Sequence, residues 1–400
     1  MPARIRLLPA CLWFLVLASP LLGAEGKCGL CHPQEQVLAK DSVHASEGIG
    51  CAGCHGGDPT TVDEAAAHGD GFQALTDRRE IPRACATCHA DQEMMRPYNL
   101  PVGQYALYQT SQHGKALARG DDRAAVCTDC HGLHEVRRAD SPRSPVNIRN
   151  VGTTCGRCHG DRVLMERYGH DADVLADYEE SVHGRAVSDG NLGAPTCINC
   201  HGVHGATPPG VGDLDKVCGN CHTQTRQAFL DGPHHEAMAA ANLPECQSCH
   251  SNHAIERFGF ADLRVLCSEC HDEGSEAVGV GLEMQTLVVG AVSAIDRAEQ
   301  LTVEAERVPL NVEDHLARLT EARTQITESL SLMHAVSVEP VDAVARRARS
   351  IGDEVHHELT VKMDRTNAYI GLAVFWFYLA VTLAILFVYK RRLARQRVSR

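Results

Sequence analysis

The chain has 400 residues, with 51 acidic and 38 basic side chains and a formal net charge of −13. This acidic balance argues against nucleic acid as a partner, because surfaces that bind nucleic acid neutralise phosphates with Lys and Arg. Only 4% of the residues are aromatic, whereas Gly and Pro number 34 and 17. This composition argues against a large core built from the chain's own side chains.

Residues 1–24 are predicted to form a secretory signal peptide. Arg4 and Arg6 supply a basic start, and residues 12–17 form a short apolar run. The alternative is a lipoprotein-type sequence ending at Cys11, but the apolar run continues past that cysteine, which favours the plain signal peptide. The sequence therefore predicts an exported protein.

A C-x-x-C-H motif occurs nine times between residues 28 and 271. This motif is the attachment signature of c-type haem, in which two thiols a helical turn apart bond to the porphyrin and the histidine binds the iron. Zinc sites and disulfides are the alternatives, but zinc sites do not require a histidine after every second cysteine. The motifs predict nine covalently attached haem c groups, at Cys28, Cys31 and His32; Cys51, Cys54 and His55; Cys85, Cys88 and His89; Cys127, Cys130 and His131; Cys155, Cys158 and His159; Cys197, Cys200 and His201; Cys218, Cys221 and His222; Cys246, Cys249 and His250; and Cys267, Cys270 and His271.

Further histidines recur at matched positions around the motifs and are predicted to be the second axial ligands. One class follows a proximal histidine in the string C-H-x-x-H, and we expect each member to bind a neighbouring haem. Its members are His134, His204 and His253, with His68 as the substitute in the first repeat. The other class precedes a pair of motifs and comprises His44, His113, His183 and His235, with His234 as the alternative to His235.

After the solitary first motif, the chain shows four repeats of similar plan, each with two motifs and a period of roughly 60–80 residues. The candidates for the remaining sixth ligand are His170, His334 or a methionine among Met94, Met95 and Met165. The histidines suffice to close every iron on both sides. We expect short helices and loops around the haems with little or no sheet, and no folding of this segment without haem.

Residues 274–367 lack cysteine and show helical periodicity, which predicts a helical domain after a haem domain at residues 25–273. A first helix is expected from Val278 to Val308, where Pro309 ends it, and Asn311 can cap a second one. The second helix carries an apolar stripe, and a third begins near Pro340. The stripe consists of Leu316, Leu319, Ala322, Ile326, Leu330 and Met333. His315, His356 and His357 are interpreted as surface or core histidines of these helices.

Residues 368–389 are predicted to form one transmembrane helix. The uncharged run from Tyr369 to Tyr389 spans about 31 Å at 1.5 Å per residue, which matches a bilayer core. A basic tail, residues 390–400, follows it. The positive-inside rule places this tail in the cytoplasm and the haems on the periplasmic side of the inner membrane.

The strings Ser-x-His-Gly (from Ser181), Cys-His-Gly-x-His (from Cys200) and Cys-His-Gly-Gly-Asp-Pro (from Cys54) resemble the bacterial multihaem c-type cytochromes with doubled C-x-x-C-H motifs. The resemblance covers residues 28–271 and implies an electron conduit of a respiratory chain. A more distant similarity, by haem-pair motif alone, is to octahaem hydroxylamine-oxidising and tetrathionate-reducing cytochromes. No C-x-x-C-K motif occurs, so the resemblance does not extend to their catalytic haem.

We therefore expect a mainly α, membrane-anchored electron-transfer protein that exchanges electrons with redox proteins and a quinone-linked membrane partner. The alternatives are a terminal reductase of a nitrogen or sulfur compound at one five-coordinate haem, and a quinol dehydrogenase.

Overall fold

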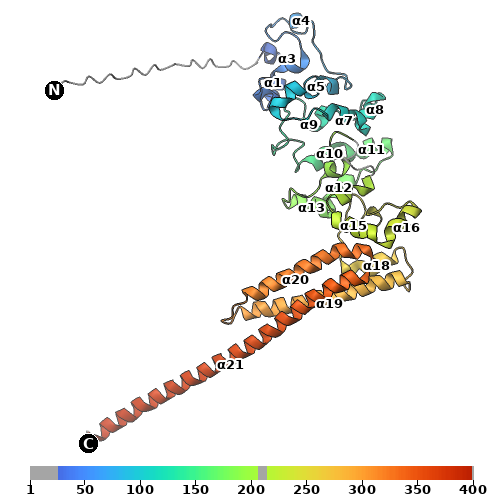
Figure 1. The fold of residues 1–400 in the computed structure, drawn as a ribbon. Helices are drawn as coiled ribbons and strands as arrows, with labels where there is room; N and C mark the ends of the chain where they lie inside the picture. Colours follow the sequence, from blue (N-terminus) through green and yellow to red (C-terminus); the bar gives the residue numbers. More distant parts are fainter. Residues whose placement is uncertain (1–25, 206–213, 399–400) are drawn as a thin grey trace, which may run out of the picture. The chain divides into compact units, whose positions relative to one another are not determined.

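The computed structural model describes residues 26–205 and 214–398. Within these ranges the chain consists of helices, turns and loops without any strand, which confirms the predicted mainly α fold (Figure 1). The signal peptide predicted at residues 1–24 lies outside the described residues.

The chain divides into two compact units. Unit 1 comprises Met1–Leu175 and Ala186–Pro209, and unit 2 comprises Ala176–Arg185 and Gly210–Arg400. Two helices span the boundary between them, α12 (Val174–Glu180) and α13 (Val182–Ser188). The division therefore places the third repeat in both units and the last three motifs in the same unit as the C-terminal helices.

Unit 1 is built from short helices joined by loops. The chain is interrupted often by Gly and Pro, which shortens helices, and serine or aspartate side chains cap several of them. Its elements are η1 (Lys27–Leu30), α1 (Pro33–Lys40), α2 (Val43–Ser46), α3 (Cys51–His55), α4 (Glu64–Ala67), α5 (Ile81–His89), α6 (Gln92–Met95), η2 (Arg96–Tyr98), α7 (Gln104–Thr110), α8 (Gln112–Ala118), α9 (Cys127–His131), α10 (Val151–His159), α11 (Arg162–Tyr168) and α14 (Cys197–His201).

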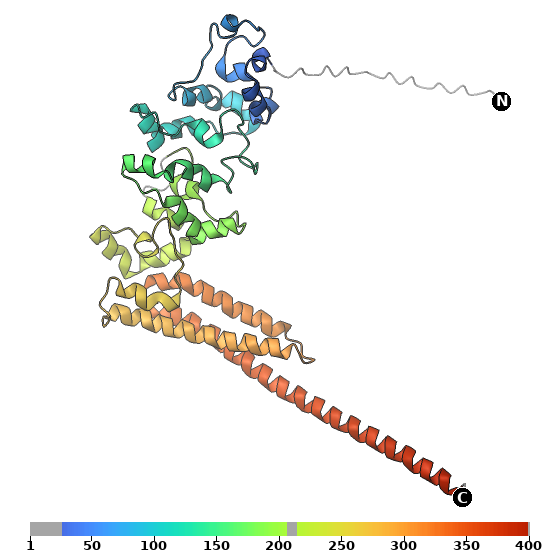
Figure 2. The same ribbon diagram turned by 180° about the vertical axis from the view of Figure 1, so that it is seen from behind.

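Unit 2 begins in the same manner and ends in three long helices. Its short elements are η3 (Leu214–Asn220), α15 (Thr223–Asp231), α16 (Pro233–Ala241), α17 (Gln247–His250), η4 (Phe260–Asp262) and α18 (Leu263–Ser268). The long helices are α19 (Glu276–Ala305), α20 (Glu313–Leu332) and α21 (Val338–Val398), with the 3₁₀ turn η5 (Met333–Ala335) between the last two (Figure 2).

The helices α19, α20 and α21 pack around a continuous apolar core. Ile295, Leu319 and Leu359 are completely or almost completely buried in it. The Asn311 side chain accepts a hydrogen bond from the Glu313 backbone N–H, but the N-cap of α20 is Val312, one residue after the predicted cap Asn311. Leu316, which the sequence assigns to the apolar stripe, is exposed, and the neighbouring His315 is buried instead. Phe260 of η4 belongs to the same core, so the core extends across the predicted domain boundary at residue 273.

Two described helices, α19 and α21, are long and apolar enough to cross a membrane by length and composition. The apolar side of α19 packs in the helical core, which makes α19 a core helix. The helix α21 instead continues without a break past the core, and its apolar side chains from Tyr369 to Tyr389 are mostly exposed. A possible transmembrane helix therefore lies in α21.

Candidate metal centres

Most C-x-x-C-H motifs fold as a single helical turn that ends at the histidine. The motif helices α3, α9 and α14 each run from the first cysteine to the histidine. Residues three apart in a helix lie on the same face, so both thiols of a motif point the same way. The glycine after the histidine has a positive φ in all three, with values of 67° at Gly56, 92° at Gly132 and 84° at Gly202. Glycine adopts this conformation without strain, which lets the chain leave the motif at once.

Three motifs depart from this plan in their second half. In the first, seventh and ninth motifs, the helices η1, η3 and α18 end before the second cysteine, so Cys31, Cys221 and Cys270 lie outside a helix and are exposed. The turn still closes, because the N–H groups of His32, His222 and His271 each donate to the carbonyl of the first cysteine at 2.9 Å. Both thiols therefore remain one turn apart in these motifs as well.

The second cysteine of the third motif, Cys88, lies inside α5 and is half-buried. Its thiol is near that of Cys54 in the second motif. Like Cys31 and Cys221, Cys88 lies beside a proximal histidine, where attachment of a haem requires a thiol. The bond from each of these cysteines to a porphyrin stays a prediction from the motif.

The string Ser-x-His-Gly is an N-terminal helix cap that fixes the position of its histidine. In α8, the Ser111 hydroxyl accepts a hydrogen bond from Gly114 N–H (3.0 Å) and donates one to the Tyr108 carbonyl (2.6 Å). A Cβ atom at Gly114 would lie 2.1 Å from that carbonyl oxygen, so only glycine fits there. His113 is therefore held at the second position of a capped helix.

The same cap recurs in the third repeat. The Ser181 hydroxyl accepts from Gly184 N–H at 3.0 Å and donates to the Tyr178 carbonyl at 2.6 Å, and His183 lies at the second position. In the first repeat, Ser42 caps α2 by accepting a hydrogen bond from His44 N–H. Both of these helix starts also bind the chain two residues beyond a C-H-x-x-H histidine, since Val43 N–H donates to Val136 and Val182 N–H to Ile255. The repeats in the sequence are thus repeats in structure.

The histidine rings face one another in pairs. In the part of the chain that the structure describes, eight proximal histidines each face one further histidine, with ring centroids 5.9–6.4 Å apart. The pairs are His32–His68, His44–His89, His55–His134, His113–His159, His131–His204, His183–His222, His234–His271 and His250–His334.

This spacing fits one metal ion held between two imidazoles. A metal-bound imidazole nitrogen lies about 2.0 Å from its ion, so two nitrogens on opposite sides are about 4 Å apart. The ring centre lies roughly 1 Å behind each nitrogen, which gives a centroid separation of about 6 Å. With two thiols beside each proximal ring, the residues present match the requirements of a covalently attached, bis-histidine haem.

The pairing follows a simple rule along the chain. A histidine that precedes two motifs faces the second of them, as His113 faces His159. A histidine of the C-H-x-x-H class faces the first motif of the preceding repeat, as His134 faces His55 and His204 faces His131. His68 plays this second role for His32 of the solitary first motif. The proximal His201 and the C-H-x-x-H member His253 stay predictions from the sequence.

In the fourth repeat, the histidine that faces a proximal histidine is not His235, which the sequence predicts as the axial ligand, but its alternative His234. The structure places His234 opposite His271, whereas the His235 ring lies against Phe229 and its Nδ1 is 3.9 Å from a Glu245 oxygen. Gly232 is the N-cap of α16 and Pro233 its first residue. His234 therefore occupies the second helical position, the one that His113 occupies after Ser111. Proline prefers the first helical position, so Pro233 was the sequence signal for this register.

The other candidates for a sixth ligand lie in different surroundings. His170 and Met94 are exposed, and Met95 and Met165 are buried as packing residues. His334 instead faces the proximal His250 at a centroid distance of 6.1 Å. No local motif marks His334. It is a candidate in the sequence only because the ninth iron still needs a sixth ligand.

Hydrogen bonding and burial prepare these rings for metal binding. The Nδ1 atoms of His55 and His250 lie 2.9 and 3.2 Å from backbone carbonyl oxygens, which leaves Nε2 as the nitrogen available to a metal. Burial keeps the pKa of many facing rings below the ordinary value, so they are neutral at pH 7 and their nitrogens can bind iron. These rings are His44, His89, His113, His131, His183, His204, His234 and His334.

The thiols of consecutive motifs lie beside one another. Hydrogen bonds between first cysteines raise the pKa of Cys85, Cys155 and Cys246, with Cys127, Cys197 and Cys218 as the respective partners. Burial first, and the nearby thiol second, raises the pKa of Cys51 beside Cys28, of Cys54 beside Cys85 and of Cys249 beside Cys270. For Cys130, burial is followed by Asp129 and then by the nearby Cys158 thiol. Within unit 1, which holds motifs one to six, motifs that are consecutive in the sequence are therefore also neighbours in space. The same holds within unit 2 for motifs seven to nine.

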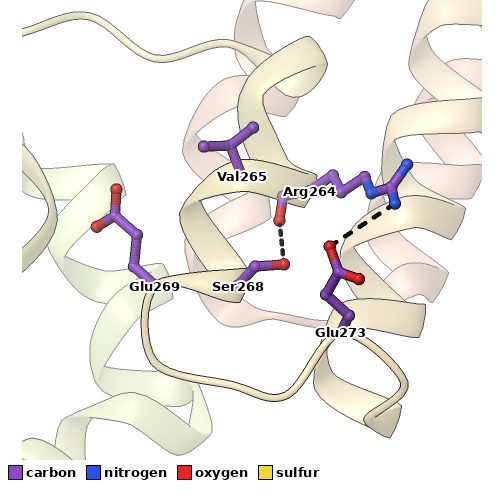
Figure 3. Close-up of a pocket in the computed structure, with 5 residues that line it drawn as sticks. All are labelled: Arg264, Val265, Ser268, Glu269 and Glu273. Atoms are coloured by element: carbon purple, nitrogen blue, oxygen red, sulfur yellow. Dashed lines mark hydrogen bonds and ion pairs between the residues drawn. The ribbon is translucent and has the colours of Figure 1, made fainter.

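One open surface depression lies next to the last motif. Figure 3 shows it on α18, lined by Arg264, Val265, Ser268, Glu269 and Glu273. The Ser268 hydroxyl donates to the Arg264 carbonyl, and Arg264 lies 3.9 Å from Glu273 in a solvent-exposed ion pair. Such exposed ion pairs contribute little to the stability of the fold. The depression contains none of the facing histidines, so the metal centres lie elsewhere.

Residues 43–159 match the family model for cytochrome c3. The matched segment contains four of the nine motifs and two complete repeats. No curated protein matches the chain, and no solved structure does. The family match over this segment, together with the C-x-x-C-H motifs and the facing histidines, supports a multihaem electron-transfer cytochrome of the c type with covalently bound haem c.

Proposed function

We propose that this protein is a nonahaem cytochrome, anchored in the inner membrane by a single span, that carries electrons along residues 28–271. The observation that carries the proposal is the set of eight facing histidine pairs, each beside the two thiols of a C-x-x-C-H motif. When bound, haem c supplies a one-electron iron couple. The chain attaches the porphyrins, supplies both axial nitrogens and sets the order of the sites.

Axial ligation by two imidazoles suits electron transfer rather than catalysis. It leaves no position for a substrate, and two imidazoles favour lower reduction potentials than imidazole with a thioether. The alternative, a reductase of a nitrogen or sulfur compound, needs one iron with an open axial position. The proximal histidines with a described facing ring, from His32 to His271, do not support such a site.

The order of the thiol contacts supports transfer in sequence order. Cys28 lies beside Cys51, Cys54 beside Cys85, and Cys85 beside Cys127, so each attachment site adjoins the next. Porphyrins bonded to adjoining thiols are themselves neighbours, which is the condition for short electron steps. We infer one linear path within each unit.

The helix α21 supports exchange with a protein partner rather than with quinol in the bilayer. Between Val338 and Tyr369, where the apolar run begins, α21 rises about 45 Å at 1.5 Å per residue. Transmembrane helices tilt by about 20° on average, which shortens this height only slightly. His334, the facing histidine nearest the span in sequence, therefore stands far from the lipid. We propose that a membrane oxidoreductase, linked to the quinone pool, delivers or accepts the electrons.

Haem counting and spin state test the proposal. We expect purified full-length protein to carry nine haems by mass and by pyridine haemochrome absorbance, and only low-spin ferric signals in electron paramagnetic resonance. Fewer haems would contradict the count. A high-spin signal in the wild-type protein that shifts on addition of nitrite or hydroxylamine would favour the reductase instead.

The anchor is tested separately in cells. We expect the protein to stay in membranes after a carbonate wash and to leave them in detergent. Protease added to spheroplasts should remove the haem-stained region while a tag after Arg400 stays protected. Release by carbonate, or cleavage of the tag, would contradict the proposed anchor or its orientation.

A further inference from the structure

His334 lies outside the C-x-x-C-H region, in the helical part of unit 2. It is the middle residue of η5, the turn that joins α20 to α21. Its ring faces that of the proximal His250 with centroids 6.1 Å apart and planes 23° apart. This separation matches that of His113–His159, at 6.0 Å, in which both residues lie among the motifs.

Hydrogen bonds orient both rings of this pair in the same way. His334 Nδ1 lies 3.0 Å from the Leu330 carbonyl, one turn earlier in the chain, and His250 Nδ1 lies 3.2 Å from the Glu256 carbonyl. A carbonyl at Nδ1 fixes the tautomer and makes Nε2 the metal-binding nitrogen, as in most metal-bound histidines.

The turn that carries His334 is itself held in place. The Thr225 and Ser331 hydroxyls lie 3.1 Å apart, which links α15 to the end of α20. Gly232 approaches the turn so closely that a Cβ atom there would lie 3.0 Å from the His334 carbonyl oxygen. Val336, just after the turn, has a left-handed φ of 49°, a strained conformation for a β-branched residue. The surrounding structure thus determines where His334 points.

The pairing rule along the chain requires a spare histidine opposite the proximal His250. The first proximal histidine of a repeat faces a spare histidine of the following segment, as His55 faces His134 and His131 faces His204. His250 is the first proximal histidine of the last repeat, and no further motif follows residue 271. His334 takes the role that the next repeat would otherwise fill.

We propose that His334 is the sixth ligand of the haem attached at Cys246 and Cys249, so that the helical region is an integral part of the cytochrome. This inference rests on the proposed multihaem function. It means that the turn before α21 is bonded, through the iron, to the haem-binding part of the chain. It also means that the iron at His250 is closed to external ligands.

The test uses full-length, haem-loaded protein in detergent. We expect His334→Ala to keep nine haems and to gain a high-spin ferric signal equal to one haem in nine. After reduction, this variant should bind one equivalent of carbon monoxide. His170→Ala is the matched control, because His170 is also a candidate ligand in the sequence but is exposed, and it should show neither change.

A His334→Ala protein that keeps nine haems, remains wholly low-spin and binds no carbon monoxide would overturn the inference. If this variant does not accumulate, His334→Met decides, since a thioether can still bind iron. It should raise the reduction potential of a single haem in a redox titration, because His/Met ligation favours higher potentials. Unchanged haem reduction potentials in His334→Met would also overturn the inference. Failure of the multihaem proposal would look different, because wild-type protein would then lack the nine haems.

Discussion

The haem-ligand region, residues 26–272, and the helical region, residues 276–398, are stabilised in different ways. In the helical region, Ile295 and Leu359 are fully buried in a core of aliphatic side chains. In the haem-ligand region, Phe260 and Leu263 join that helical core, and the other described core cluster consists only of Leu117, Ala124 and Val126. The comparison teaches that the first region must bury its apolar surface against its cofactor, whereas the second closes a core with its own side chains.

The largest expected effect comes from removing the cofactor. We expect full-length protein made without c-type haem maturation to lose protection of residues 26–272, with cleavage faster by on the order of 100-fold, because cleavage tracks the open population. The helical region should resist protease, since its core does not depend on haem. Limited proteolysis followed by mass spectrometry of the fragments measures both.

Protein matured in the same host is the control for this experiment. Equal protease resistance of residues 26–272 with and without haem would contradict the comparison, because the region would then have enough side-chain packing of its own. Equal sensitivity of both regions in the unmatured chain would show instead that the helical core depends on the haem-ligand region.

A core truncation in the helical region has the next largest expected effect. Leu319 is 1% exposed, so Leu319→Ala should destabilise this region by about 2–5 kcal/mol through lost burial and a residual cavity. Thermal unfolding followed by far-ultraviolet circular dichroism measures the loss. The haem content should not change, because Leu319 lies in the core of the helical region.

Leu316→Ala is the matched control, since it removes the same atoms one turn away from a side chain that is 41% exposed. It should change stability by less than about 0.5 kcal/mol. A similar loss in both variants would mean that the apolar stripe is buried as the sequence predicts, and that the described burial of His315 is wrong.

These positions also show what could be predicted from the sequence. The helical fold and the start of α20, to within one residue, were predictable because periodicity and the Asn311 side chain just before the N-cap Val312 are local signals. The burial of His315 in place of Leu316 was not predictable. Either of two neighbouring residues can belong to the apolar stripe until packing against the partner helix fixes the rotation of α20 about its axis. The buried His315 is accommodated by Lys362 Nζ at 3.1 Å and Glu358 Oε2 at 3.4 Å, both from α21.

The candidate site divides in the same way. The nine attachment motifs are strings of five residues, so the sequence specifies them completely. The pairing of rings is not local, because His134 faces a motif of the preceding repeat and His334 comes from another region of the chain. The sequence prediction named His235 with His234 as the alternative, and the structure places the ring of His234, at the second helical position after Gly232, opposite His271.

A smaller effect is expected where the chain places a ligand through its backbone. Gly114→Ala would bring a Cβ atom within 2.1 Å of the Tyr108 carbonyl oxygen and shift the His113 helix, at a cost of about 1–3 kcal/mol. We expect a partial high-spin signal from the haem at His159, detected by electron paramagnetic resonance. The control is Gly103→Ala, where a Cβ atom would meet nothing within 4 Å. Equal spectra for the two variants would contradict the positioning role of Ser-x-His-Gly.

The smallest expected effect concerns an ion pair on the helical region. Arg318 Nη1 lies 3.0 Å from a Glu358 oxygen, and this hydrogen bond with Arg318 holds the pKa of Glu358 below its usual value. Because the folded-state pKa is lowered, the pair contributes stability above the unfolded-state pKa and loses it as the pH falls through the folded-state pKa. Arg318→Gln should therefore cost less than about 1 kcal/mol at pH 7, and the difference from wild type should shrink when the pH falls below the pKa of Glu358.

Thermal unfolding of the Arg318→Gln variant at neutral and acidic pH measures this small difference. Arg347→Gln, at an exposed position of α21, controls for the loss of one positive charge and should show no such pH dependence. A cost that is the same at both pH values would assign the effect of Arg318 to the packing of its aliphatic stem rather than to Glu358. In that case even the surface of the helical region would be held mainly by apolar contacts, which would sharpen its contrast with the haem-ligand region.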